Sequence, residues 1–420
     1  MIGAGSSPYL VDLKMRSPRL KVIPALLSIL FPVCMMAQDC AGGRYRDAIF
    51  TDVLRTNAIA FGSNTGVSGG QQILFLDVYR PVNDPAIARP VVIVAFGGSF
   101  ISGNRNDVEI ICNEFARRGY VAVAPDYRIG LFDPDPVNAM LAVIRATHDL
   151  KACVRYLRRS VAEDGDPWNI DPDRIIVGGV SAGAIAALHA TYLNEEDEFP
   201  PQIAALGESL GGVEGLSGNA GYPSSVAACY SFSGAIGDTS WIDAGAPPLA
   251  SIHDAGDQVV PYYTQEFIIG NDPIGLVASG SHDIHLRLEH LGIDHCLLTY
   301  PGNGHVSYLL TDPIDALDHM FHFTANVVCG EEAYCGAQFV DIERIASVAE
   351  NLITHDPINE RIIVGAVGEV KMIDMSGRSV LSAFAGSPGT TVHVGGLPPG
   401  IYVVRVGAMP MIARQIVITH

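Results

Sequence analysis

One serine has the local sequence expected of a nucleophile. Ser181 lies in the motif Gly-Val-Ser-Ala-Gly at residues 179–183, after an apolar run at residues 175–177 and before an Ala- and Leu-rich run that extends to residue 193. This order predicts a strand, a sharp turn and a helix. At such a turn the glycines avoid Cβ clashes, and the hydroxyl projects from the carboxyl edge of the sheet in front of a helix N-terminus. The competing interpretation is a serine N-cap on a core helix.

The Gly-x-Ser-x-Gly pattern occurs twice more, so the pattern alone is a weak signal. Ser68 lies in a Gly-, Ser- and Asn-rich stretch with no helix behind it, and Ser209 lies in a long glycine-rich segment with no strand before it. We expect both serines to lie in flexible loops.

A serine nucleophile needs a base and an acid that orients the base. His305 and Asp257 each follow a predicted strand, and His305 also precedes the closing helix. Ligands gather at the edge of a parallel sheet where the carboxyl ends of its strands meet. We therefore predict His305 as the base and Asp257 as the acid, in the chain order Ser, Asp, His. The alternatives are Asp254 for the acid and His253, His282, His285 and His295 for the base.

The same chemistry needs N–H donors for a developing oxyanion. We expect one donor to be the backbone N–H group of Ala182, which follows the nucleophile, and the others to come from the Gly-Gly-Ser turn at residues 97–99. Small residues let the backbone approach a substrate oxygen closely. The competing interpretation of this turn is a tight exit from a strand.

The elements that must position these residues alternate between strands and helices. Apolar runs predict strands at residues 73–79, 91–96, 120–124, 175–180, 226–232, 248–253 and 296–300, and helical spacing predicts helices at 108–118, 137–160, 182–193 and 312–328. Residues 40–70 are polar and are expected to form loops. The alternation indicates an α/β fold with a doubly wound, mostly parallel sheet across residues 38–336.

The pattern changes in residues 337–420. Short β-type runs at 362–366, 369–374, 392–394, 401–406 and 415–419 are separated by turn signals such as Ser376-Gly377. This pattern predicts a small all-β domain, a β-sandwich, and it carries no cluster of catalytic residue types.

Composition and the N-terminus indicate export. The chain has a formal net charge of −19, with 45 acidic and 26 basic residues, which argues against nucleic acid or an anionic membrane surface as a partner. Residues 1–37 have a basic region, an apolar run at 22–37 and a small residue, Ala37, before a polar one, so they are expected to be a signal peptide. The alternative is an uncleaved anchor helix.

Seven cysteines follow the predicted signal peptide, and an exported chain can oxidise them. Cys40 begins the predicted mature domain, and Cys329 and Cys335 end it, so a clip between its two ends is expected. The odd number leaves at least one thiol free. Cys229 and Cys296 lie in apolar, strand-like runs and are expected to be buried as small hydrophobic residues. No Cys/His spacing resembles a zinc site, and neither a metal nor a cofactor is expected.

With these residues in place, the chain resembles an α/β-hydrolase of the carboxylesterase and lipase type over roughly residues 70–328. The motifs that carry the resemblance are Ala-Phe-Gly-Gly-Ser-Phe-Ile-Ser-Gly at 95–103, Gly-Tyr-Val-Ala-Val-Ala-Pro-Asp-Tyr-Arg at 119–128, His-Asp-Leu-Lys-Ala-Cys-Val-Arg-Tyr-Leu at 148–157, the serine motif at 179–183, Asp-Gln-Val-Val-Pro at 257–261 and Gly-His at 304–305. The resemblance implies that Gly98, Ser99 and Ala182 supply the oxyanion donors. One departure is Phe96, which stands where the family has the histidine of its His-Gly-Gly-Gly motif.

The C-terminal part, roughly residues 345–420, resembles the sorting domain of type IX secretion cargo. The resemblance rests on Val-Lys-Met-Ile-Asp-Met-Ser-Gly-Arg at 370–378, Leu-Pro-Pro-Gly-Ile-Tyr-Val-Val-Arg at 397–405 and a final short strand. It implies export through the type IX secretion machinery, followed by release or surface attachment. The alternative is a generic β-sandwich binding module.

Together these features predict a secreted serine hydrolase that cleaves carboxylic esters through an acyl-enzyme. One alternative is a peptidase of the prolyl-oligopeptidase type, although the chain lacks room for a propeller before the hydrolase part. The other is a non-catalytic, hydrolase-like surface protein that binds a partner. Residues 194–224 and 262–290 are expected to cover the site and to set its specificity.

Overall fold

The computed structural model describes residues 40–339, except 270, 271 and 312, and residues 353–418, except 358, 366–367, 375–378 and 407–411. The predicted signal peptide at residues 1–37 and the predicted turn at Ser376-Gly377 lie outside the described residues.

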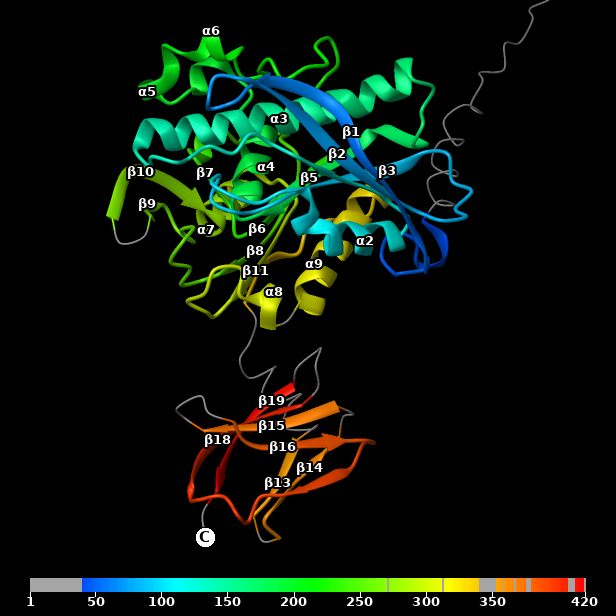
Figure 1. The fold of residues 1–420 in the computed structure, drawn as a ribbon, viewed down its shortest axis with the longest axis vertical. Coiled ribbons are helices and arrows are strands. Elements are labelled where there is room, and N and C mark those ends of the chain that lie inside the picture. The colour runs from blue at the N-terminus through cyan, green and yellow to red at the C-terminus, as the bar shows by residue number, and fades with distance from the viewer. Residues whose placement is uncertain are drawn as a thin grey trace, which may run out of the picture. The chain divides into compact units, whose positions relative to one another are not determined.

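A central sheet organises residues 53–339 (Figure 1). In spatial order its strands are β1 (Val53–Thr65), β2 (Gln71–Pro81), β4 (Val121–Pro125), β3 (Arg89–Ala95), β5 (Ile170–Val180), β6 (Ala228–Phe232), β8 (Leu249–Asp254), β11 (His295–Tyr300) and β12 (Gly336–Phe339). The pairs β1–β2 and β2–β4 are antiparallel, and the other pairs are parallel. The predicted mostly parallel sheet is therefore confirmed. Its last strand extends to Phe339, beyond the predicted boundary at residue 336.

Helices cover both faces of this sheet. The longer helices are α2 (Glu109–Arg117), α3 (Pro136–Glu163), α4 (Ala182–Tyr192), α7 (Ser281–Leu291) and α9 (Pro313–Cys329). Helices α3 and α4 pack together on one face, and α2 and α9 lie on the other (Figure 1). There the rings of Phe115 in α2 and Phe321 in α9 are 5.0 Å apart. Because helices lie on both sides, β3, β4 and β6 are buried along their whole length, which explains their continuous apolar sequences.

The prediction of loops across residues 40–70 was wrong for residues 53–65, which form strand β1. Strand β1 runs antiparallel to β2 at the edge of the sheet, and most of its side chains are exposed or half-buried. An edge strand of this kind needs no apolar pattern, because backbone pairing with its neighbour holds it. Ser68 lies in the turn between these strands, where Gly66 N donates to Gly70 O at 2.8 Å. Ser209 was expected in a flexible loop and lies instead in the short helix α6 (Gly207–Leu210).

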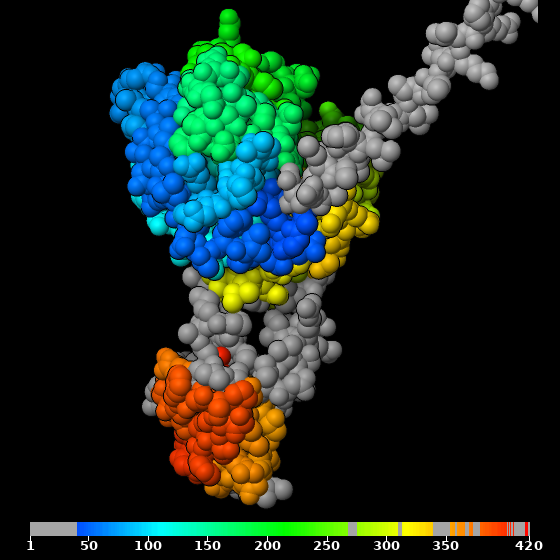
Figure 2. Space-filling model, turned by 90° about the vertical axis from the view of Figure 1, so that its right-hand side faces the viewer, coloured from blue at the N-terminus to red at the C-terminus, as the bar shows by residue number. Residues whose placement is uncertain are grey.

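The segment around Arg46 lies beside helix α9. Figure 2 shows the N-terminal residues, in blue, next to the yellow residues of α9 and the segment that follows it. Arg46 connects them, because its Nη2 donates to Asn326 Oδ1 at 3.0 Å and to Glu331 Oε2 at 3.3 Å. The start and the end of this part of the chain are therefore neighbours in space.

The cysteines differ in part from expectation. Cys229 is free and buried, as predicted, and Cys112 and Cys153 are also free and buried. Cys296 is buried, as predicted, but it is not a free thiol, because it forms a disulfide with Cys335. Its cause is the parallel pairing of β11 with β12, which sets Cys296 opposite Gly336, the neighbour of Cys335. Cys335 is thus unavailable for the predicted clip to Cys40, while Cys40 and Cys329 are each disulfide-bonded.

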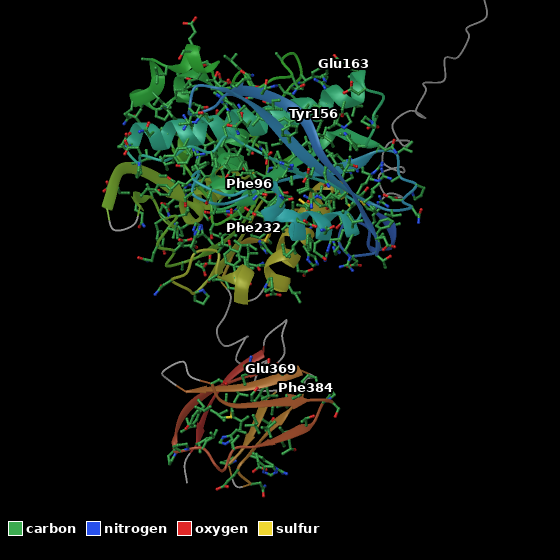
Figure 3. The ribbon with its side chains drawn as sticks, in the orientation of Figure 1. Phe96, Tyr156, Glu163, Phe232, Glu369 and Phe384 are labelled. Carbon is green, nitrogen blue, oxygen red and sulfur yellow. A yellow bond between two sulfur atoms is a disulfide. The ribbon has the colours of Figure 1, made fainter. Side chains whose placement is uncertain are left out.

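Every element that the structure describes in residues 353–418 is a strand. One antiparallel sheet contains β13 (Ile353–Asp356), β14 (Arg361–Val364) and β17 (Thr390–His393), and another contains β16 (Ser379–Ala385), β15 (Gly368–Asp374), β18 (Gly400–Val406) and β19 (Ile412–Ile418). Both sheets contribute to one buried cluster, which includes Ile362 and Val364 from the first and Met372 and Val404 from the second. Figure 3 labels Glu369 and Phe384, which are paired across β15 and β16.

Among the described helices, none combines the length and the apolar sequence needed to cross a membrane.

Candidate active site

Ser181 occupies the sharp turn between β5 and α4. Its backbone has φ 55° and ψ −119°, in the positive-φ region that few non-glycine residues adopt. The two motif glycines are required by close packing. A Cβ on Gly179 would lie 2.6 Å from Ala95 O, and a Cβ on Gly183 would lie 2.3 Å from the same oxygen. The strand, turn and helix predicted from the sequence are therefore present, and the turn presses against the end of β3.

The structure brings the three predicted triad residues together. His305 Nε2 is 2.7 Å from Ser181 Oγ, and His305 Nδ1 is 2.7 Å from Asp257 Oδ2. Ser181 follows β5, Asp257 follows β8 and His305 follows β11, so each comes from the carboxyl end of a parallel strand. These ends meet at one edge of the sheet, which is why residues far apart in sequence form one chain of hydrogen bonds.

Asp257 is buried and held in its ionised form. Its Oδ1 accepts hydrogen bonds from the backbone N–H groups of Val259, at 2.8 Å, and Val260, at 3.0 Å. Burial alone would raise the pKa of Asp257, but hydrogen bonds from His253 and His305, with the charge interaction with His305, outweigh burial and hold the pKa well below its usual value. An ionised Asp257 accepts a hydrogen bond from Nδ1–H of His305, which leaves Nε2 as the acceptor that faces Ser181.

The alternative acid, Asp254, has a different position. It accepts hydrogen bonds from Ser307 N at 2.9 Å and Ser307 Oγ at 2.5 Å, so it anchors the loop that carries His305. A Cβ on Gly302 would lie 2.8 Å from Asp254 Oδ1, which explains the glycine in that loop. Asp254 therefore positions the loop and does not bond to the imidazole in this structure.

The alternative histidines also have other partners. His253 donates from Nε2 to Val260 O at 3.1 Å, lies 3.4 Å from Asp257 Oδ2, and bonds Ser281 Oγ through Nδ1. It is a second contact of the acid, which sequence reasoning missed, although its place four residues before Asp257 is a signal. His282 bonds Asp283, and His285 and His295 bond each other.

The predicted oxyanion donors border the same turn. Gly98 has φ 119°, and its carbonyl accepts from Ile101 N at 2.9 Å and Ser102 N at 3.1 Å, which closes a tight loop after β3. A Cβ on Gly97 would lie 3.4 Å from the Cβ of Ser181, so this loop packs directly on the serine turn. Ser99 and Ala182 line the same pocket as Ser181. Ala182 is the first residue of α4, and N–H groups in a first helical turn have no partner within the helix.

Phe96, where the resembled family has histidine, serves packing. Its ring stacks on Tyr127, with centroids 4.1 Å apart and an angle of 11°, and the Tyr127 hydroxyl donates to Phe96 O at 2.8 Å. Figure 3 labels Phe96 and Phe232 in the interior of this part of the chain. An apolar stack therefore supports the loop from below, where a histidine would offer hydrogen bonds.

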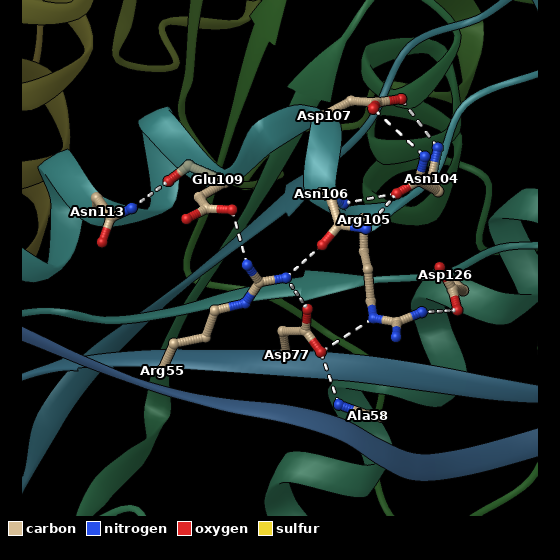
Figure 4. A network of polar contacts seen from close by, with 10 residues as sticks. All are labelled: Arg55, Ala58, Asp77, Asn104, Arg105, Asn106, Asp107, Glu109, Asn113 and Asp126. Atoms are coloured by element: carbon tan, nitrogen blue, oxygen red, sulfur yellow. Dashed lines mark hydrogen bonds and ion pairs between the residues drawn. The ribbon is translucent and has the colours of Figure 1, made fainter.

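A network of ion pairs holds the far end of this loop (Figure 4). Arg105, in the 3-10 helix η2 (Arg105–Val108), donates from Nε to Asp77 Oδ1 at 2.9 Å and from Nη1 to Asp126 Oδ2 at 2.6 Å. Asp77 is fully buried in β2 and also accepts from Arg55 at 2.7 Å. The loop that begins at Gly97 is thus tied to β2 and to the segment after β4.

A pocket of about 1240 Å³ opens on Ser181. One face of α4 lines it with Ala182, Ile185 and His189. The remaining walls come mainly from residues 139–144 of α3, residues 195–202, residues 235–243, and the hairpin of β9 (Gln265–Ile269) and β10 (Asp272–Gly280). Parts of both segments expected to cover the site, 194–224 and 262–290, therefore form its walls.

Sequence reasoning missed His189 and Trp241, which both line the pocket. The signal for His189 was its spacing of eight residues from Ser181, which places both on one helix face. Trp241 had no such signal, because the short 3-10 helix η4 (Thr239–Trp241) has no periodic pattern. Among the described residues, no group of three or more His, Cys, Asp or Glu side chains could hold a metal ion.

Part of the chain is similar in sequence to known proteins. Residues 76–212 match the BD-FAE family model. Esterase-5C of Drosophila miranda is 29% identical over 162 residues, which cover 38% of this chain and 28% of that protein. Fumonisin B1 esterase of Sphingopyxis macrogoltabida is 26% identical over 151 residues, which cover 33% of this chain and 25% of that protein. The chain thus spans less than a third of the length of these curated relatives.

A solved structure also aligns with the chain. The propionate-bound thermophilic esterase of Thermogutta terrifontis covers 64% of this chain and 91% of its own, with 22% identity and a TM-score of 0.44. The sequence similarity to esterases and the mostly parallel central sheet fit an α/β-hydrolase fold.

Proposed function

We propose that the protein hydrolyses carboxylic esters, with Ser181 as nucleophile, His305 as general base and acid, and Asp257 as the residue that orients His305. The observation that carries the proposal is the chain of two hydrogen bonds, each 2.7 Å long, that joins the three side chains. Likenesses to esterases and lipases support the same reaction class.

The reaction proceeds in two steps. Ser181 Oγ bonds to the ester carbonyl carbon as its proton passes to His305 Nε2; the tetrahedral intermediate then expels the alcohol, which takes that proton. Water attacks the resulting acyl-enzyme, gives a proton to His305, and releases the carboxylic acid as the proton returns to Ser181. The backbone N–H groups of Gly98, Ser99 and Ala182 stabilise the oxyanion in each step.

The test compares Ser181→Ala with Ser209→Ala in the full chain, using p-nitrophenyl acetate and butyrate. Ser209 is a matched control, because it lies in the same sequence pattern but is exposed in α6. We expect Ser181→Ala to lose roughly 10⁴-fold or more in kcat and Ser209→Ala to retain the activity of the parent. A folded parent that neither hydrolyses esters nor reacts with a serine-directed phosphonate would contradict the proposal.

We also propose that the protein is exported by a signal peptide at residues 1–37, and that the part of the chain after β12, whose described strands lie within residues 353–418, is a β-sandwich that directs it through the type IX secretion machinery. The resemblance of residues 345–420 to sorting domains supports this, as does the buried cluster shared by their two sheets. In a host with type IX secretion, removal of residues 345–420 should keep the protein in the periplasm. Secretion at the parent's level without these residues would rule out the sorting role.

A further inference from the structure

The pocket next to Ser181 runs along helix α4. Ser181, Ile185 and His189 all line it and are spaced four residues apart, so they follow one face of the helix. A rise of 1.5 Å per residue separates the Cα atoms of Ser181 and His189 by about 12 Å along the axis. A substrate whose carbonyl carbon lies at Ser181 can therefore extend along this face toward the imidazole of His189.

The imidazole of His189 presents a hydrogen-bond acceptor. The side chain is 6% exposed, its Nδ1 donates to Ile185 O at 2.8 Å, and its ring lies 5.4 Å from that of Trp241. Burial lowers the pKa of His189 to about 4, so the ring is neutral at pH 7. Since Nδ1 carries the proton, Nε2 has a free lone pair, and it has no hydrogen-bond partner among the described residues.

The charged side chains among the described lining residues of the pocket are all acidic. Among the described lining residues there is no Lys or Arg, and the acidic ones are Glu195, Asp197, Glu198, Asp238 and Asp243. Most of these carboxylates are exposed to solvent, whereas His189 is buried. An anionic group on a substrate would meet repulsion from this rim. An ammonium group at His189 would lose its hydration for a single neutral acceptor, which is unfavourable.

We propose, resting on the ester hydrolase function above, that His189 determines specificity by accepting a hydrogen bond from an uncharged hydroxyl group of the substrate, at a point about 12 Å from Ser181 along the helix axis. Nε2 is the ring nitrogen of that side chain that has no hydrogen-bond partner among the described residues. A hydroxyl group can donate to it without bringing a charge into the pocket. Ile185 and Trp241 line the same pocket and offer apolar surface next to the group.

The test uses pairs of esters that differ in one terminal group. The acyl pair is p-nitrophenyl 8-hydroxyoctanoate and p-nitrophenyl nonanoate, in which a methyl group replaces the hydroxyl. The alcohol pair is the acetate of 1,8-octanediol and nonyl acetate, so the two pairs tell which side of the ester occupies the pocket. The measured quantity is the ratio of kcat/KM for the hydroxyl ester to that for the methyl ester, in the parent and in His189→Phe.

In one of the two pairs, we expect this ratio to fall about tenfold in His189→Phe, the effect of one hydrogen bond. His189→Phe keeps an aromatic ring against Trp241 but removes the acceptor, and His189→Leu replaces it if the Phe variant does not fold. His189→Gln keeps an acceptor and should restore most of the ratio. His322→Phe is the matched control, because His322 Nδ1 also bonds the carbonyl four residues earlier, at 2.8 Å, but on the exposed side of α9.

Two outcomes would overturn the inference. The first is an unchanged ratio in both pairs for the apolar variants. The second is a carboxylate-ended or ammonium-ended ester of the same length that the parent prefers to the hydroxyl ester by tenfold or more. Turnover of p-nitrophenyl acetate separates these results from a failure of the proposed function, because an acetyl group is too short to reach His189.

Discussion

At the scale of the residue, the site depends on positions where nothing larger than glycine fits. Gly179 and Gly183 flank Ser181, and each has a backbone carbonyl of β3 where a Cβ would stand. The strained backbone of Ser181 persists because the packing of the surrounding strand and helix prevents it from relaxing. The position of Ser181 is therefore fixed mainly by the packing of its backbone, in addition to the hydrogen bond of its side chain.

The first prediction concerns Gly183→Ala. The new Cβ would lie 2.3 Å from Ala95 O and 2.4 Å from Phe96 O, so the backbone of β3 must move. We expect the free energy of unfolding to fall by about 1–3 kcal/mol and ester hydrolysis to fall with it. Gly207→Ala is the control, because no atom lies within 4 Å of its added Cβ. Equal stability of the two variants in urea unfolding would show that the turn tolerates the shift.

The second prediction concerns Asp257→Asn. An amide at this position favours the wrong tautomer of His305, so kcat should fall by about 10⁴-fold with a small change in KM. The lowered pKa of Asp257 means that its ionised form stabilises the fold above the ordinary carboxyl pKa, and that this contribution is lost only as pH falls through the lowered pKa. The stability gap between parent and variant should therefore persist from pH 8 to about pH 4.

Asp254→Asn separates the two carboxylates. Asp254 bonds Ser307 and not the imidazole, so its substitution should loosen the loop and reduce kcat far less than Asp257→Asn. A larger loss of kcat in Asp254→Asn than in Asp257→Asn would indicate that Asp254, and not Asp257, orients His305.

At the scale of the element, the loop after β3 is held at both ends. Gly97 packs on the serine turn at one end, and Arg105 bonds Asp77 and Asp126 at the other. Burial would raise the pKa of Asp77, but hydrogen bonds from Ala58 N, Arg55 and Arg105 outweigh it and lower the pKa. The ionised Asp77 is thus a fixed anchor between an edge of the sheet and the loop that is proposed to supply oxyanion donors.

The third prediction follows from this anchor. Arg105→Met leaves Asp77 buried with fewer partners and frees the loop, so we expect kcat to fall by roughly 10–100-fold, since a small misplacement of catalytic groups is costly. KM should change less than kcat, because only residues 99–101 of the pocket lining lie on this loop. Arg117→Met is the control, because Arg117 pairs with Glu114 on the surface of α2. Equal kcat values in the two variants would show that the ion pairs of Arg105 do not contribute to catalysis.

The sequence alone predicted the position of the elements that are buried on all sides. Strands β3, β4 and β6 are buried on both faces and were predicted within a few residues, as were α3 and α4. Strand β1 was missed because pairing with β2, and not its own pattern, makes it a strand. The hairpin of β9 and β10 was missed for a related reason: it forms a separate small sheet with β7 (Ala235–Ile236). The three predicted triad residues are joined by two hydrogen bonds, and each could be singled out because it follows a recognisable strand by at most five residues.

At the scale of the whole molecule, buried neutral histidines make stability depend on pH. Burial lowers the pKa of His148 to about 3 and that of His189 to about 4, from a usual value of 6.5. The unfolded chain then binds more protons than the folded one between pH 6.5 and about 4, so stability falls as pH decreases through this range. Each histidine contributes a slope of up to about 1.4 kcal/mol per pH unit.

The fourth prediction tests this slope. His148→Gln can still donate to Gly212 O, which His148 Nε2 contacts at 2.8 Å, but cannot be protonated. Urea unfolding between pH 7.5 and pH 4 should show a shallower loss of stability in this variant than in the parent. His322→Gln, on the surface of α9, should leave the slope unchanged. Parallel curves for parent and His148→Gln would assign the acid sensitivity to other groups.

The contact of Arg46 with Asn326 and Glu331 has a consequence for how this part of the protein can be rebuilt. Because its first and last segments touch, a short linker can join them, and new termini can be opened elsewhere, for instance at Gly165, where an added Cβ meets no atom within 4 Å. Such a circular permutant preserves the spatial order of the strands. The edge of the sheet that carries Ser181 and His305 therefore depends on the spatial order of the strands, and not on the order in which they are synthesised.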